Sequence, residues 1–175
     1  MFNPPRKYSE YIQDVPKSID WILKKIYPPN YGSFYDTTTQ YVSAPNTPTY
    51  WNIDTMVEAR GIYIESLNKI VVSSSGVYNF QFSAQLDKIG GGKQYADIWI
   101  MKNGVNVTES NTKVLLSGNN DKAVAAWNFV LSMNSGDYLQ FVFSSPDATT
   151  HLTYIPAAPP IPSTPSLILT VTEVK

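Results

Sequence analysis

The 175-residue chain contains no cysteine, and only 15% of its residues are Asp, Glu, Lys or Arg, where a typical domain has about a quarter. Without cysteine the chain cannot form disulfides or thiolate metal sites. The absence of cysteine does not indicate whether the protein lies in a reducing or an oxidising compartment. The formal net charge is −1, and the basic residues form no cluster beyond Lys24 and Lys25. Net charge therefore offers no attraction to nucleic acid or to an anionic membrane.

Long apolar runs are also absent. No stretch approaches the ~20 consecutive apolar residues of a membrane span. Residues 1–7 include Pro4 and Pro5 and contain no apolar signal segment. We therefore expect a protein that is made in a cytoplasm, with no signal peptide and no membrane span.

Catalytic groups are scarce. His151 is the single histidine, and its place in an expected loop predicts a solvated surface side chain. No Gly-x-Ser-x-Gly nucleophile motif occurs, and the glycines at 90–92 lack the Lys-Ser/Thr pair of a phosphate-binding loop. A glycosidase pair of carboxylates would have to come from six acidic residues, most of them in or beside expected turns: Asp87, Asp97, Glu109, Asp121, Asp137 and Asp147. We expect no enzyme activity, no cofactor and no metal site.

In two of the expected turns, the sequence suggests what the acidic side chain binds. Asp137 follows Gly136 and is predicted to accept hydrogen bonds from the backbone of its own turn. The Asn-Asn-Asp sequence at 119–121 could bring oxygen atoms to the apex of an assembly. An ordinary polar turn is the favoured interpretation there.

Residues 1–30 differ from the rest of the chain and are predicted to form an N-terminal arm with a short amphipathic helix. Four apolar residues at helical spacing form its stripe: Ile19, Ile22, Leu23 and Ile26. Pro28 and Pro29 end the helix, which is too short to be stable alone. The stripe either packs on its own domain or docks on another subunit or larger assembly, and the separating prolines favour docking.

Residues 31–175 are predicted to form one domain of strands and turns. The clearest strand is 76–86, in which apolar residues alternate with polar residues over nine positions. Its polar face is uncharged and consists of Asn79, Gln81, Ser83 and Gln85. Such a face is either exposed to solvent or forms a subunit interface.

Turn signals separate eight to ten such strands. Asn103-Gly104 lies between two apolar runs and predicts a tight hairpin, and residues 144–165 form a long proline-rich loop. The pattern indicates an all-β antiparallel sandwich or barrel. We expect six side chains to form the core: Tyr78, Phe80, Phe82, Phe141, Phe143 and Leu169.

Two tryptophans are candidates for stacking against a ligand. In the strand at 95–101, Ile98 and Ile100 alternate with Trp99 and Met101, so both faces are apolar. One face must be core, and the other must be covered by a loop, a neighbouring protomer or a ligand. Trp99 and Trp127 could therefore serve as sugar-stacking platforms, although core packing is the commoner role of such residues.

Four motifs occur in a familiar order: Gly-Val-Tyr-Asn-Phe at 76–80, Lys-Asn-Gly at 102–104, a strand ending in the Gly-Asp turn at 136–137, and an apolar strand at 166–174. Over about residues 31–175 the chain resembles the globular head of the first complement component and its tumour-necrosis-factor-like relatives. The resemblance implies a ten-stranded jelly roll that forms a homotrimer. It further implies that strands around 33–42, 77–86, 138–143 and 166–174 share the sheet facing the threefold axis, with Gln140 joining the polar face.

The sequence looks like the versions of this domain in virus and phage structural proteins, in which an N-terminal segment anchors a trimeric head. We therefore expect a virion protein, either a capsid decoration or a fibre knob, that binds other virion proteins through residues 1–30. The alternative is an adhesion head that recognises a host surface glycan.

Overall fold

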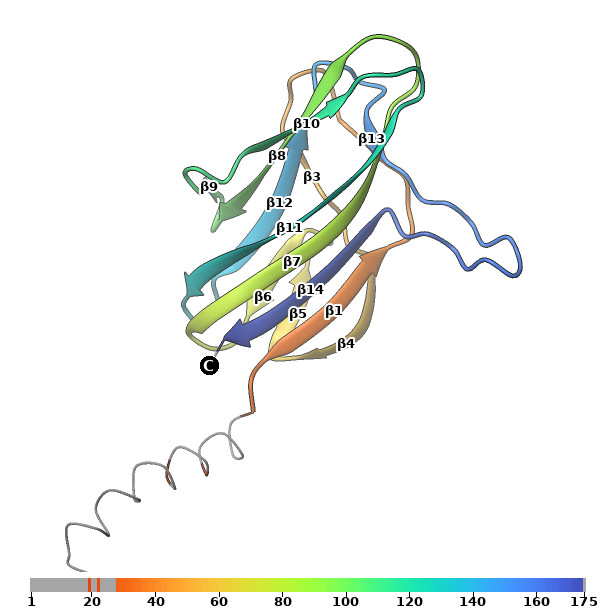
Figure 1. Ribbon diagram of the computed structural model, residues 1–175. Helices are drawn as coiled ribbons and strands as arrows, with labels where there is room; N and C mark the ends of the chain where they lie inside the picture. The colour runs from red at the N-terminus through yellow and green to blue at the C-terminus, as the bar shows by residue number, and fades with distance from the viewer. Residues whose placement is uncertain (1–18, 20–21, 23–27, 175) are drawn as a thin grey trace, which may run out of the picture.

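The computed structural model describes residues 19, 22 and 28–174. They form a sandwich of two antiparallel sheets, shown in Figure 1. The β7 sheet has the order β2 (Gln40–Tyr41), β13 (His151–Leu152), β7 (Gly76–Asp87), β14 (Leu167–Val174), β1 (Tyr31–Asp36) and β4 (Thr55–Arg60), and β11 (Lys122–Met133) also pairs with β7. The β8 sheet has the order β10 (Thr112–Leu116), β8 (Gln94–Lys102), β12 (Tyr138–Ser144), β6 (Lys69–Val72) and β5 (Ile62–Glu65), with β3 (Thr49–Tyr50) on β12 and β9 (Val105–Asn106) on β8.

The core lies between the two sheets and confirms the expected residues. All six predicted core side chains are at most 2% exposed: Tyr78, Phe80, Phe82, Phe141, Phe143 and Leu169. Trp51, which the sequence did not single out, is also buried and stacks on Phe141 with ring centroids 5.3 Å apart. The alternation in β7 therefore reports correctly which face of that strand is buried.

Two predicted turns meet at one end of the β8 sheet. Asn103 and Gly104 have φ values of 51° and 78° and connect β8 to β9, as the hairpin signal predicts. Asp137 accepts a hydrogen bond from the backbone N–H of Asn134 at 2.8 Å and from the side-chain amide of Asn103 at 2.8 Å. These bonds, together with the ammonium of Lys102 at 2.9 Å, lower the pKa of Asp137 to about 2. The turn and the hairpin therefore stabilise each other.

One predicted sheet assignment is wrong. Strands β1, β7 and β14 share a sheet, but β12 lies in the opposite sheet between β8 and β6. Gln140 on β12 is buried and donates to the side-chain oxygen of Asn68 at 2.9 Å. Its place is consequently in the β8 sheet, apart from the polar face of β7.

The long loop and its histidine also differ from expectation. Residues 151–152 form the short strand β13, which pairs with β2 and β7. His151 is 5% exposed instead of solvated, and its ring stacks on Tyr41 with centroids 4.5 Å apart. Its Nε2 lies 4.0 Å from a carboxylate oxygen of Asp87. The short strand escaped detection because two residues are too few to show a period.

Both chain ends of the described head lie at the same end of the sandwich, as Figure 1 shows. The backbone N–H of Glu173 donates to the carbonyl of Asn30 at 2.8 Å. Of the predicted helical stripe, Ile19 and Ile22 are helical and exposed, whereas Leu23 and Ile26 lie outside the described residues. The described residues include no helix of the length and apolarity needed to cross a membrane.

Candidate functional site

The side of the β7 sheet that faces away from the core is the first candidate site. We call it the outer face. It comprises the outward-pointing residues of four adjacent strands, up to the Lys122–Asp87 ion pair where β11 begins and β7 ends. None of these residues is charged: Tyr31, Ser33 and Tyr35 of β1; Val77, Asn79, Gln81, Ser83 and Gln85 of β7; Val124, Ala126, Asn128, Val130 and Ser132 of β11; Ile168, Thr170, Thr172 and Val174 of β14.

The strand register arranges the outer face in rows that cross the sheet. In one row, Gln81 lies between Asn128 on β11 and Thr170 on β14. In the next, Asn79 lies between Val130 and Thr172, and it accepts a hydrogen bond from the amide of Asn128 at 2.7 Å. Directly opposed side chains on one face are close enough to interact. The four predicted interface residues of β7 are therefore the centre of a continuous surface.

The outer face mixes amides and hydroxyls with exposed valines. Val124 is 62% exposed, Val130 58% and Val174 52%. Scattered apolar side chains are normal on any surface, but here they share one face with no charge between them. Such a composition is typical of a surface that can be buried without stranding a charge.

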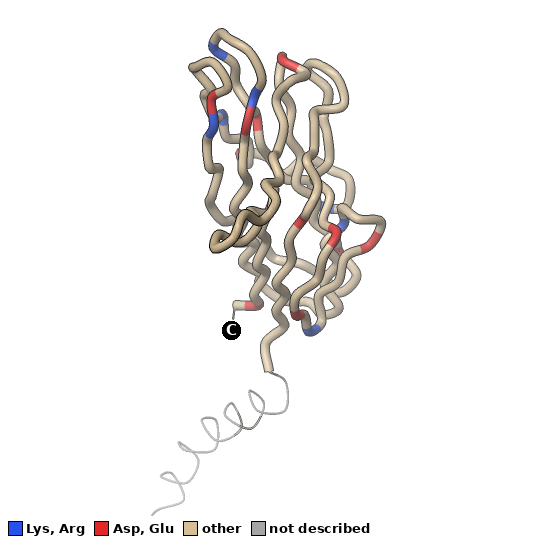
Figure 2. Tube along the Cα trace, turned by 90° about the vertical axis from the view of Figure 1, so that its right-hand side faces the viewer, with Lys and Arg blue, Asp and Glu red and all other residues tan. Residues whose placement is uncertain are grey.

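Charged residues begin only at the margins of the outer face. Lys122 forms an ion pair with Asp87 at one end, and Glu58 and Arg60 lie on the edge strand β4. The hydroxyl of Tyr31 donates to Glu58 at 2.7 Å, which raises the pKa of Tyr31. In Figure 2 the few coloured positions are separated by long uncharged stretches of chain.

The β11 edge is a second distinctive surface. β11 pairs with β7 on one side and has no further strand of the β7 sheet on the other. Its inward side chains Trp127, Phe129 and Leu131 are only half-buried, although they pack against the core. The ring of Trp127 meets that of Phe82 edge-on at 4.7 Å. No hydrogen-bond partner for its indole N–H occurs in the described part of the chain.

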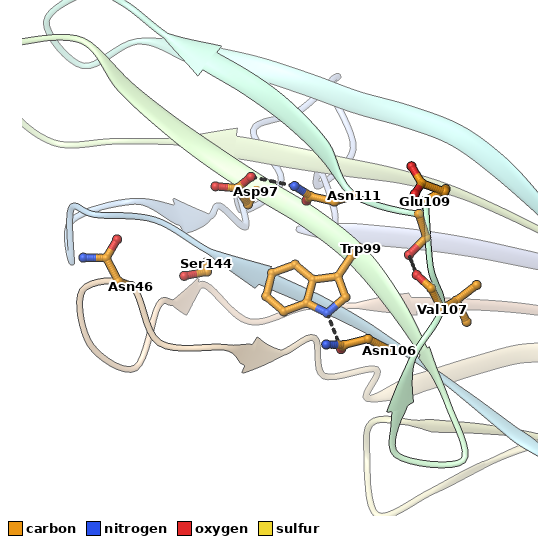
Figure 3. Close-up of a pocket in the computed structure, with 9 residues that line it drawn as sticks. Asn46, Asp97, Trp99, Asn106, Val107, Glu109, Asn111 and Ser144 are labelled. Carbon is orange, nitrogen blue, oxygen red and sulfur yellow. Dashed lines mark hydrogen bonds between the residues drawn. The ribbon is translucent and has the colours of Figure 1, made fainter.

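The third candidate is a groove of about 400 Å³ on the β8 sheet, drawn in Figure 3. Trp99 extends across it, between Asp97 and Asn111 on one side and Asn106 on the other. The indole N–H of Trp99 donates to the side-chain oxygen of Asn106 at 2.9 Å. Of the two predicted stacking residues, Trp99 therefore lines a groove, and Trp127 belongs to the β11 edge.

The acidic residues in the turns are engaged by their own backbone. Asp121 accepts from the N–H groups of Ser117 at 2.6 Å and of Lys122 at 3.1 Å, and bonds of this kind lower its pKa. Its carboxylate is thus used to close the turn at 118–121. Within residues 28–174 no three His, Asp or Glu side chains converge in a way that could hold a metal ion.

Comparisons with known proteins identify the architecture. No protein-family model matches the sequence, and a search of curated proteins finds no match. Among solved structures, Eiger TNF from S. frugiperda aligns with a TM-score of 0.57 and 11% identity over 85% of this chain and 94% of that one. Murine APRIL at pH 8.5 aligns with a TM-score of 0.54 and 12% identity over 83% of this chain and 99% of that one. The chain has a tumour-necrosis-factor-like jelly-roll fold. Identities this low show the fold of the head and nothing finer.

Only the β7 part of the outer face of this TNF-like head was identified from the sequence. The outward residues of β11 and β14 were not singled out, although both strands were predicted. Polar and apolar residues alternate in both strands, but the sequence does not show that both strands flank β7. For the groove, Trp99 was singled out but Asn46, Asn111 and Ser144 were not, since they come from distant loops and strand ends.

Proposed function

We propose that the protein forms a homotrimer in which the outer face of each head packs against the β11 edge of its neighbour. The observation that carries the proposal is the absence of charge across the outer face of four strands, combined with exposed valines. A surface exposed permanently to water rarely lacks Lys and Glu over such a span. A stable contact of this kind buries more than ~1,200 Å².

The two surfaces are different, and this difference favours a ring. A contact between unlike patches is head-to-tail, and it closes on itself when the rotation between neighbours divides a full circle. The half-buried aromatic side chains of β11 supply the apolar part of the contact. The outer face supplies amides and hydroxyls, which can be buried in a contact when they are hydrogen-bonded.

We propose further that the trimer is a structural head of a virion, as a capsid decoration or fibre knob, held by residues 1–30. The support is the sequence resemblance to virus and phage structural proteins and the position of the chain ends. Both ends of the described head leave the sandwich at one end. Attachment at that end would leave the loops of the opposite end free to project.

The assembly is tested by Gln81→Glu, with Gln94→Glu as the matched control. Gln81 lies at the centre of the outer face, whereas Gln94 begins β8 in the other sheet. A carboxylate buried without a partner at each of these contacts loses its solvation and weakens the assembly. We expect Gln81→Glu to reduce the light-scattering mass toward one chain and Gln94→Glu to leave it unchanged. Equal masses for both variants would contradict the proposed contact.

The anchoring role is tested by deleting residues 1–29, which keeps Asn30 and its hydrogen bonds with Glu173 and Tyr78 in the head. The truncated head should keep its mass and melting temperature, because its core lies wholly within residues 34–171. Purified particles should lack it when probed by mass spectrometry. If the truncated head unfolds, the arm stabilises its own domain and the anchoring proposal fails.

A further inference from the structure

We propose that the Trp99 groove binds a neutral saccharide, with the indole ring of Trp99 as the stacking platform. The groove opens on the side of the β8 sheet away from the core. It is separate from the outer face of the β7 sheet, so the proposal does not depend on the trimer. Its volume of about 400 Å³ falls within the range of small-molecule sites, roughly 300–1,000 Å³.

Local structure holds the Trp99 ring in place. Ile98 and Ile100 point into the core, so Trp99 points outward between them. The Asn103-Gly104 hairpin turns the chain back and places Asn106 beside β8, where its side-chain oxygen accepts from the indole N–H at 2.9 Å. A ring fixed before the ligand arrives loses little conformational freedom on binding.

Polar groups surround the ring on both sides, as Figure 3 shows. Asp97 accepts from the side-chain amide of Asn111 at 2.8 Å and pairs with Lys113 at 2.9 Å, so its carboxylate is held in position. Each carboxylate oxygen retains acceptor capacity beyond these bonds. The backbone N–H of Asn46 donates to the carbonyl of Ser145 at 2.7 Å. In the described part of the chain, the side-chain NH₂ groups of Asn106 and Asn46 have no hydrogen-bond partner. The groove thus presents both donors and acceptors beside a flat apolar ring.

This combination fits a pyranose ring. One face of a pyranose carries C–H groups that pack on an aromatic ring, and its rim carries adjacent hydroxyls that each donate and accept a hydrogen bond. Lipid-like ligands need a predominantly apolar lining, whereas the apolar groups here are Trp99 and Val107.

Charge further restricts the ligand class. The described residues that line the groove include Asp97 and Glu109 but no Lys or Arg, and Lys113 is already paired with Asp97. Glu109 has no partner among the described residues and is held at a φ of 59°, an uncommon conformation for its residue type. An acidic groove repels carboxylated sugars and phosphates, so the ligand is neutral.

The test is saturation-transfer NMR on the full chain with five probes. Four are the neutral methyl glycosides of glucose, galactose, mannose and N-acetylglucosamine, and the fifth is the methyl glycoside of sialic acid. We expect saturation of the ring protons of at least one neutral probe at millimolar concentration. The sialic acid probe should bind at least about tenfold more weakly than that one.

Three variants assign the binding to the groove. Trp99→Ala should weaken it at least about tenfold, and Asn106→Asp should also weaken it, because it keeps an acceptor for the indole but removes the NH₂ donor. Tyr63→Ala, which removes an exposed aromatic side chain from β5 of the same sheet, should have no effect. Circular dichroism establishes that each variant is folded. The proposal is overturned if no neutral probe is saturated at about 10 mM, or if folded Trp99→Ala binds as well as the unmodified protein.

Discussion

Phe82 lies at the centre of the aromatic core, and its removal is the most informative test of the packing. Its ring centroid is 4.7 Å from that of Trp127, 5.0 Å from that of Phe141 and 5.2 Å from that of Trp51. Truncation of a buried Phe to Ala costs about 3–5 kcal/mol, and aromatic pairs contribute about 0.5–1.5 kcal/mol each beyond the buried area. We therefore expect Phe82→Ala to lower the free energy of unfolding by about 4 kcal/mol.

Urea unfolding followed by tryptophan fluorescence measures this loss. Protomer concentration must be held constant, because unfolding of an oligomer depends on concentration. Phe82→Leu is the control, since it keeps most of the volume and should cost less than about 1.5 kcal/mol. A loss below about 1 kcal/mol for Phe82→Ala would mean that the core-facing side of β7 has been assigned to the wrong residues.

Two further predictions concern the turns that meet at the end of the β8 sheet. Asp137→Asn should lower the free energy of unfolding by about 1–2 kcal/mol at pH 7. The pKa of Asp137 is lowered to about 2 in the folded protein, so the carboxylate stabilises the fold fully above its unfolded pKa, near 4. That contribution is lost as the pH falls toward 2, and denaturation from pH 7 to pH 2 should show the difference between the two proteins disappearing. Gly104→Ala should lower the free energy of unfolding in urea by about 1 kcal/mol, because φ at Gly104 is +78°. Gly118→Ala is the control and should cost less, since Gly118 lies in a turn without positive φ. Equal costs for the two variants would contradict the hairpin geometry.

The elements that could be predicted from the sequence are those with a local signal. Polar and apolar residues alternate along β7 without a break, so Phe80 and Gln81 were correctly assigned to opposite faces of the strand. The Asn103-Gly104 hairpin and the Asp137 turn depend on a few neighbouring residues, and both were predicted with their mechanism.

The sheet that holds β12 could not be predicted in this way. Five successive residues of β12, from Leu139 to Phe143, are buried, so the strand has no polar face to orient it. Its place beside β8 is set by pairing between segments about 40 residues apart in the sequence, such as Phe141 with Ile100. Val142 is fully buried although it points away from the core, and it lies opposite Trp99. The indole that lines the groove is therefore a direct cross-strand neighbour of Val142, which has Tyr50 of β3 on its other side.

In the candidate sites, too, features with a local signal could be predicted and features set by long-range pairing could not. The polar face of β7 could be recognised from one strand, but its extension over β1, β11 and β14 required the strand order. His151 was misassigned because a lone histidine in a proline-rich loop is usually solvated, whereas here a two-residue strand places it against β7. Both cases show that long-range pairing decides which residues become neighbours.

We propose that heads associate through the uncharged outer face, and the molar mass of the protein in solution decides this. The molar mass of the unmodified full chain should be determined by light scattering coupled to size-exclusion chromatography at micromolar concentration. We predict a single species of three times the chain mass that persists on tenfold dilution. A mass equal to one chain would contradict the claim, because the outer face would then be an ordinary solvent-exposed surface.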